Sequence, residues 1–549
     1  MTRASGALIV LLSATLGAAL GAATGIPSGT GRPSPEPAGT ETGTPPPSSG
    51  RYARIACSLP PKEIQRVWNG FHPERSGDIQ FVPQEPNYLG NFASHSGPWD
   101  YLQRVPMFLY GPEHVPEQGE IKRPVTMADV APTFARHLGF DFQAPDGEPL
   151  VEATLPDAPP PKLILTIVWD GAGRNVLDEY PRAWPNLARL IPEGVWYDNA
   201  TVGSSPSVTP AIHSTLGTGA FPRQHGLVDL RFQVEGRVRP SAFERSTFLI
   251  EPTLGDEFDL ARDNRPVVGM VGAEGTLGMI GHGTLHPGGD RDVAAAQRAG
   301  SWGLRRSNGR YYDFPEYILD VPGLDEAERV ADEDDGTLDG YWLGLPLTTP
   351  DSLTLTPGFA EYQTAVIEEL IQREGFGQDD VPDLLYVNYK QVDKVGHRFA
   401  FPTTEMERAL ESSDDALADL IRILDAEVGA GEWVLALTAD HGSTPLPDTT
   451  GAIPIEYFEL YRDLLAAFDG DGDERLAVQT LRITQAWIDN NELEERGHTL
   501  EEMADWFMDY TWGENALDPS VIPEGQEDEK LFAAAFPADV VEGLPCVQR

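Results

Sequence analysis

Three apolar, strand-like runs of this 549-residue chain end in an aspartate, and two of these aspartates have a histidine close by. The runs are residues 163–169 before Asp170, residues 384–392 before Asp393 and His397, and residues 433–439 before Asp440 and His441. Side chains just beyond the carboxyl ends of strands in an open α/β sheet can converge on one small volume. Converging carboxylates and imidazoles are typical ligands of zinc or a similar divalent ion. The sequence therefore predicts a metal-dependent enzyme.

A candidate nucleophile lies in the segment from Ser204 to Gly226, where Thr209 is followed by Pro210. A threonine N-cap with proline at the first helical position is typical of a helix start. The hydroxyl would lie at the positive end of the helix dipole, beside free backbone N–H groups that can hold an anion. A metal ion that lowers its pKa would make Thr209 a nucleophile. A Thr-Pro cap alone is more often structural, so this assignment depends on the neighbouring motifs.

The elements that would position these residues alternate between strand-like and helical patterns. Helical patterns cover residues 185–191, 209–217, 359–373 and 404–428. Such alternation predicts an α/β fold, a three-layer α/β/α sandwich with a mostly parallel central sheet. Residues 453–540 are rich in acidic, leucine and aromatic residues. They are predicted to form a mostly helical cap or insertion that shapes the pocket.

Four motifs stand in a characteristic order along the chain. They are Asp170-Gly171, the Thr209 segment continuing through Thr218-Gly219 to His225-Gly226, Asp393-x-x-Gly396-His397, and Thr438-Ala439-Asp440-His441-Gly442. This order resembles the alkaline phosphatase superfamily, and most closely its type I phosphodiesterase/nucleotide pyrophosphatase branch. The resemblance implies two zinc ions, with other divalent metals as the alternative. It assigns Asp170, Thr209, Asp440 and His441 to one ion and Asp393 and His397 to the other.

The same resemblance implies that Thr209 attacks phosphorus and that water then hydrolyses the phospho-enzyme. Some family monoesterases grip the phosphate with a Lys and Arg pair, which residues 269–292 lack. This absence favours diesters or pyrophosphates, with Arg231 as a candidate phosphate contact; a salt bridge is its alternative role. The expected function is a secreted phosphodiesterase or nucleotide pyrophosphatase acting on a small phosphate ester or nucleotide. The alternatives are an alkaline phosphomonoesterase and a non-catalytic secreted metal-binding protein.

The second zinc still lacks one histidine, which the family supplies from a late segment. Downstream of His441 this chain has only His498, whereas residues 70–111 and 123–134 resemble the family's C-terminal part. We therefore interpret the chain as a circular permutant in which His95 is the missing ligand, with His498 as the alternative. The predicted organisation is one catalytic domain over 53–549, comprising the family's C-terminal part in 53–150, the metal-site core in 160–450 and the cap in 453–549.

Cys57 and Cys546 are the only cysteines, near opposite ends of the expected domain. An even pair in an exported protein suggests a disulfide, which requires the start and end of the domain to lie side by side. Two free thiols are the alternative.

The amino-terminal sequence and the charge predict where the protein works. Residues 1–23 have the layout of a signal peptide, with an uncleaved anchor as the alternative, and residues 24–52 are a Pro/Gly/Ser/Thr-rich linker predicted to be disordered. We expect a secreted protein without stable membrane association after cleavage. The formal charge of −46 argues against binding of duplex nucleic acid. It also means that an anionic substrate needs local positive charge.

Overall fold

The structure is a computed structural model that describes residues 47–90, 95, 97–240, 248–334, 336–470 and 475–549. The predicted signal peptide and most of the predicted linker lie outside these residues. The linker was predicted to reach residue 52, but helix α1 (Pro47–Ala56) already includes its last residues, so that boundary is wrong. Tyr52 explains the difference, because it is buried and its hydroxyl donates to the carbonyl of Glu501. A contact so distant in sequence gives no local signal.

A large sheet forms the centre of the structure and runs in the order β13-β12-β11-β17-β6-β18-β3-β7-β4. These strands are β13 (Ser301–Trp302), β12 (Asp292–Arg298), β11 (Val268–Ala273), β17 (Asp383–Tyr389), β6 (Leu163–Trp169), β18 (Trp433–Thr438), β3 (Met107–Tyr110), β7 (Val195–Tyr197) and β4 (Gly119–Ile121). The run from β12 to β18 is parallel, whereas β3 is antiparallel to both of its neighbours. The predicted mostly parallel sheet is confirmed.

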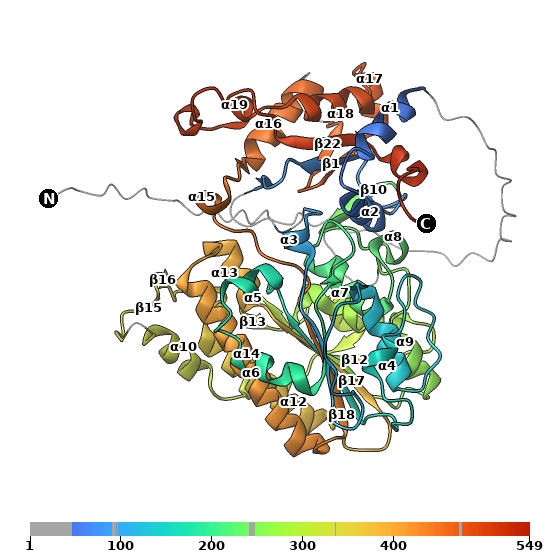
Figure 1. Ribbon diagram of the computed structural model, residues 1–549, viewed down its shortest axis with the longest axis vertical. Helices are drawn as coiled ribbons and strands as arrows, with labels where there is room; N and C mark the ends of the chain where they lie inside the picture. The colour runs from blue at the N-terminus through green and yellow to red at the C-terminus, as the bar shows by residue number, and fades with distance from the viewer. Residues whose placement is uncertain (1–46, 91–94, 96, 241–247, 335, 471–474) are drawn as a thin grey trace, which may run out of the picture. The chain divides into compact units, whose positions relative to one another are not determined.

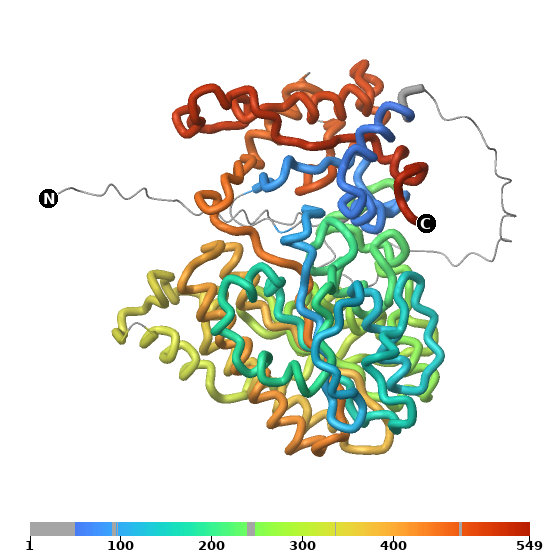
Figure 2. Tube along the Cα trace, in the orientation of Figure 1, coloured from blue at the N-terminus to red at the C-terminus, as the bar shows by residue number. Residues whose placement is uncertain are grey.

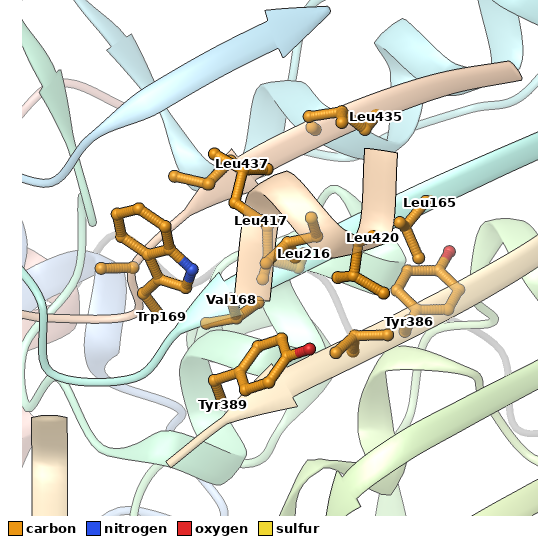
Figure 3. Close-up of a cluster of buried hydrophobic side chains, with 14 of the residues drawn as sticks. Leu165, Val168, Trp169, Leu216, Tyr386, Tyr389, Leu417, Leu420, Leu435 and Leu437 are labelled. Atoms are coloured by element: carbon orange, nitrogen blue, oxygen red, sulfur yellow. The ribbon is translucent and has the colours of Figure 1, made fainter. Parts of the chain in front are cut away.

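Helices cover both faces of this sheet (Figure 1). One set consists of α6 (Pro185–Leu190), α12 (Pro357–Glu374) and α14 (Thr404–Leu424), and the other of α4 (Val130–His137), α7 (Thr209–Thr218) and α9 (Leu254–Ala261). Every residue of β6, β17 and β18 is buried, as expected for strands covered on both sides. Figure 3 shows Leu165 and Tyr386 of these strands with Leu216 of α7 and Leu417 of α14. The three-layer α/β/α architecture is confirmed.

A second sheet combines the two ends of the described chain in what we call the cap, residues 47–89 and 453–549. Its antiparallel strands are β20 (Val478–Leu481), β21 (Gln485–Ile488), β1 (Ile79–Pro83) and β22 (Phe532–Pro537), in that order. Helices α1, α16 (Tyr457–Phe468) and α18 (Leu500–Asp509) pack against it. The tube in Figure 2 shows the blue and red ends of the chain together here. The helices predicted for residues 453–540 are present. The sheet beside them was not predicted, because its central strand β1 comes from the other end of the sequence.

Within the described residues, no helix combines the length and the apolar character needed to span a membrane.

A disulfide joins Cys57 to Cys546 across 489 residues of sequence, with a Cα–Cα distance of 5.8 Å. The predicted pairing is confirmed. Cys57 follows α1, and α1 packs against β22. The bridge therefore links the two chain segments that build the cap.

Loss of this disulfide is expected to destabilise the protein. In the variant carrying both Cys57→Ser and Cys546→Ser, we expect a loss of about 2–5 kcal/mol, because the unfolded chain is no longer cross-linked. Differential scanning calorimetry should show a lower Tm than for the oxidised wild type, and a reductant should lower the Tm of wild type alone. An unchanged Tm in the double variant would contradict the prediction.

Candidate metal and nucleophile site

Asp170 and Asp440 lie at the carboxyl ends of β6 and β18, where the sequence predicts them, and both are fully buried. Neighbouring groups hold both carboxylates in place through hydrogen bonds. The side chain of Asn388 donates to Asp170 Oδ2 at 2.9 Å, and the backbone N–H of Gly171 donates to Asp440 Oδ1 at 3.1 Å. Such contacts orient a carboxylate for a metal ligand role, and at Asp440 they leave Oδ2 without a hydrogen-bond partner among the described residues.

His441 completes the first group. Its Nδ1 lies 3.0 Å from the carbonyl of Gly442, and its Nε2 lies 3.4 Å from Asp440 Oδ2 and 3.5 Å from Asp170 Oδ1. His441 Nε2 and Asp440 Oδ2 are buried, and neither has a hydrogen-bond partner among the described residues. Buried polar atoms without partners are costly unless a ligand satisfies them. A divalent cation between a carboxylate and an imidazole fits this need.

Asp393, His397 and His95 form the second group, with donor atoms that all lie within 4.8 Å of one another. Asp393 and His397 are one turn apart on helix α13 (Gln391–Phe399), with His397 Nε2 3.2 Å from Asp393 Oδ1. His95 Nε2 lies 3.6 Å from the same oxygen. The strand before Asp393 was predicted to extend to residue 392, but β17 ends at Tyr389. Asp393 is therefore in the first turn of a helix.

His95 is held by the segment that leads to the candidate nucleophile. The hydroxyl of Ser207 donates to the His95 carbonyl at 2.6 Å, and His95 Nδ1 lies 2.8 Å from the Ser207 carbonyl. Burial, reinforced by the neighbouring His441 and His397, holds the pKa of His95 well below its ordinary value. The neutral ring that donates through Nδ1 leaves Nε2 free as a metal ligand.

The alternative ligand, His498, lies elsewhere. It is in the cap, where its ring packs on Phe468 and its Nδ1 lies 3.3 Å from Glu502 Oε2. Of the two candidates, the structure brings only His95 together with Asp393 and His397.

Thr209 is the first residue of α7, one position further into the helix than the predicted cap, and it is buried. Residues 47–89 of the cap hold the segment that precedes this helix in place. The N–H of Ser205 donates to the Arg66 carbonyl at 2.9 Å, and the side chain of Asn69 donates to the Gly203 carbonyl at 2.7 Å. The Thr209 hydroxyl accepts a hydrogen bond of 2.9 Å from Lys390 Nζ.

Sequence reasoning missed Lys390. Its ammonium group donates to Asp170 Oδ1 at 2.7 Å and lies 2.9 Å from Asp393 Oδ2, so it contacts both candidate ligand groups as well as the candidate nucleophile. Burial alone would lower the pKa of Lys390, but the surrounding carboxylates outweigh it and raise that pKa. Burial likewise opposes ionisation of Asp393, but Lys390 and His397 hold the pKa of its carboxyl well below the ordinary value.

His213 also lies beside the first ligand group. Its Nε2 lies 3.3 Å from Asp440 Oδ2 and 3.7 Å from Asp170 Oδ2. The signal that could have identified it is its position four residues after Thr209, on the same face of α7.

Arg231 is not brought to the site by any contact among the described residues. It begins β9 (Arg231–Val234). Its positive charge partly offsets the rise that burial causes in the pKa of Tyr457 of the cap. Its neighbour Asp229 pairs with Arg482 of the cap at 3.2 Å. This position favours a structural role for Arg231, at the contact between β9 and the cap.

The family model for type I phosphodiesterase / nucleotide pyrophosphatase matches residues 164–518. The chain belongs to this family. The matched part contains Asp170, Thr209, Asp393 and Asp440, whereas His95 lies before it. Membership places the chain in the alkaline phosphatase superfamily and makes it a phosphoric ester hydrolase.

Alkaline phosphatases are among the similar proteins. Alkaline phosphatase PafA of Elizabethkingia meningoseptica is 24% identical over 441 residues, which cover 70% of this chain and 78% of PafA. Alkaline phosphatase PhoV of Synechococcus elongatus is 24% identical over 335 residues, which cover 52% of this chain and 60% of PhoV. The crystal structure of wild-type PafA matches with a TM-score of 0.52 and 19% identity, covering 69% of this chain and 84% of that one. This likeness supports the alkaline phosphatase-like fold.

Proposed function

We propose that this protein is an exported, metal-dependent phosphoric ester hydrolase in which Thr209 is the nucleophile. Asp170, Thr209, Asp440 and His441 would hold one zinc or similar divalent ion, and Asp393, His397 and His95 would hold a second. The main observation that supports this proposal is that the two groups of donor atoms lie next to each other, with His441 Nε2 3.7 Å from Asp393 Oδ1. Lys390 connects both groups to the Thr209 hydroxyl.

The reaction is a double displacement at phosphorus. The ionised oxygen of Thr209 attacks phosphorus in line, an O–P bond forms, and the bond from phosphorus to the leaving oxygen breaks. The leaving oxygen takes up a proton, which balances the proton lost when Thr209 ionised. A water oxygen then bonds to the phosphorus of the phosphothreonine, the bond from phosphorus to the Thr209 oxygen breaks, and a proton from the water regenerates the Thr209 hydroxyl. When bound, the divalent ions would neutralise phosphoryl charge and lower the pKa of coordinated hydroxyl groups. The burial of Thr209 limits the access of bulk water to its oxygen.

The proposal includes the circular permutation. Residues 53–150 would correspond to the family's C-terminal part, and the place of His95 beside Asp393 and His397 supports this order. The start of the family match at residue 164 supports it as well. Export is supported by the apolar amino-terminal stretch and by the disulfide, since disulfides persist in oxidising compartments.

The test compares hydrolysis of p-nitrophenyl phosphate, bis-p-nitrophenyl phosphate and a nucleoside diphosphate ester, with and without a chelator. We expect turnover of at least one ester. Chelation should lower its rate by about 1000-fold or more, because charge stabilisation by the ions is lost, and added Zn²⁺ should restore it. A metal-bearing protein that turns over none of the three would favour the non-catalytic metal-binding alternative. Full activity after exhaustive chelation would contradict the metal-dependent mechanism.

A further inference from the structure

The ammonium group of Lys390 lies at the centre of the site. It contacts the nucleophile and one carboxylate from each ligand group, all at 2.7 to 2.9 Å. Its element explains the placement, because Lys390 directly follows β17 and precedes α13, so its side chain starts at the carboxyl end of the sheet. Within the described part of the chain, no other lysine or arginine forms an ion pair with Asp170, Asp393 or Asp440.

Lys390 changes the charge of the loaded site. Two divalent ions would already more than balance the three buried carboxylates, so the ammonium group leaves surplus positive charge beside Thr209. Burial strengthens the effect of such a charge, since little water screens it. The whole chain is strongly acidic, with a formal charge of −46, and an anionic substrate needs compensation of this kind close to its phosphorus.

The chemistry of the substrate indicates what this charge would contact. A phosphate monoester presents three non-bridging oxygens and two negative charges, whereas a diester presents two such oxygens and one charge. At attack the phosphorus is about 3–3.5 Å from the nucleophilic oxygen. An ammonium group 2.9 Å from that oxygen is therefore within reach of a non-bridging oxygen of the phosphoryl group.

We propose that Lys390 is a catalytic residue that binds the additional charged oxygen of a phosphate monoester and selects monoesters over diesters. This inference rests on the proposed function and names its substrate class. Residues 269–292 lack the Lys and Arg pair of some family monoesterases, but Lys390 delivers a cation to the site from a different segment. The selectivity then follows from charge, because the neutral ester arm of a diester offers Lys390 no anionic oxygen.

The experiment measures kcat/KM for p-nitrophenyl phosphate and bis-p-nitrophenyl phosphate in wild type and the variants Lys390→Met, Lys390→Arg and Lys394→Met. Wild type should prefer the monoester. Lys390→Met should lower monoester kcat/KM by about 100-fold or more and diester kcat/KM by less than about tenfold, because one charged donor to the transition state is lost. Lys390→Arg, which keeps the charge, should recover most of the monoester preference.

Lys394→Met is the matched control, since Lys394 lies on the same helix but pairs with Asp351 at 2.9 Å. It should leave both rates unchanged within about twofold, as is usual for an exposed ion pair. A second readout is calorimetric titration of the zinc-loaded proteins with inorganic phosphate. Lys390→Met should weaken phosphate binding by about tenfold or more while mass spectrometry still finds the wild-type metal content.

Equal losses for both esters, or unchanged phosphate affinity in Lys390→Met, would overturn the inference. If Lys390→Met does not fold, Lys390→Gln gives the same comparison with a neutral side chain that still donates. Failure of the proposed function looks different: wild type would then turn over neither ester, and Thr209→Ala would match wild type in every assay. A preference of wild type for the diester would overturn the inference while leaving the proposed function intact.

Discussion

Replacement of Thr209 by alanine is expected to lower kcat for phosphate ester hydrolysis by about 10⁴-fold or more, as is typical when a covalent nucleophile is removed. The side chain is small, and among the described residues its hydroxyl has one hydrogen bond, accepted from Lys390, so the fold should persist. Stopped-time assays with p-nitrophenyl phosphate, together with circular dichroism and metal analysis, measure the effect.

Thr209→Ser is the control for this variant because it keeps a hydroxyl group at the start of α7. It should retain activity within about tenfold of wild type, since nucleophile and helix terminus are both preserved. Thr209→Ala with more than about one per cent of wild-type turnover, in protein free of other phosphatases, would remove Thr209 from the mechanism.

Replacement of His95 by alanine is expected to reduce the metal content from about two ions per chain to about one, because two donors seldom hold zinc against competition. The rate should fall by about 1000-fold or more, since one of the two metal ions proposed to stabilise phosphoryl charge is lost. Inductively coupled plasma mass spectrometry and the ester assays give the two quantities. This variant also tests the permuted chain order, because His95 precedes the matched family segment.

His498→Ala is its matched control, since His498 is the other candidate ligand and contacts Glu502 and Phe468 in the cap. Metal content and rate should stay at the wild-type level. If His95→Ala kept both ions, or if His498→Ala lost one, the assignment of the second ligand group would be wrong.

The central sheet could be predicted because its strands carry a local signal. Continuous apolar runs such as residues 163–169 are typical of strands buried on both faces, and this run coincides with β6. The helix predicted over 359–373 lies within α12, and its local signal was the helical spacing of its apolar residues. Asp170 and Asp440 followed from strand ends, which fix the edge of the sheet where side chains meet.

Lys390 escaped prediction because of one boundary. The run over residues 384–392 suggested a strand that continues to Asp393, and within a strand Lys390 would be one of several alternating polar positions. In the structure the chain turns into α13 at Gln391, which brings Lys390 and Asp393 to the same small volume. Boundaries between elements depend on tertiary contacts, and these are the least visible feature in a single sequence.

The sheet of the cap could not be predicted for a different reason, which is that its paired strands lie far apart in the sequence. β1 and β22 pair across most of the chain, from Ile79 opposite Pro537 to Pro83 opposite Phe532. Neither strand has its partner nearby in the sequence, so residues 453–540 suggested a mostly helical segment and gave no sign of the sheet. The disulfide could be predicted because two cysteines allow a single pairing.

The two-ended construction of the cap limits how this enzyme can be shortened. The cap consists of two arms, residues 47–89 and residues 453–549. Deleting both arms would cut the chain a few residues before His95. It would also remove Arg66 and Asn69, which hold the segment before Thr209 through hydrogen bonds. Deleting one arm alone would strip the other of its neighbouring strand and of its sulfur partner. Minimal versions for engineering must therefore retain both arms, and insertions are better directed to exposed positions such as the turn at Gly336 and Gly340.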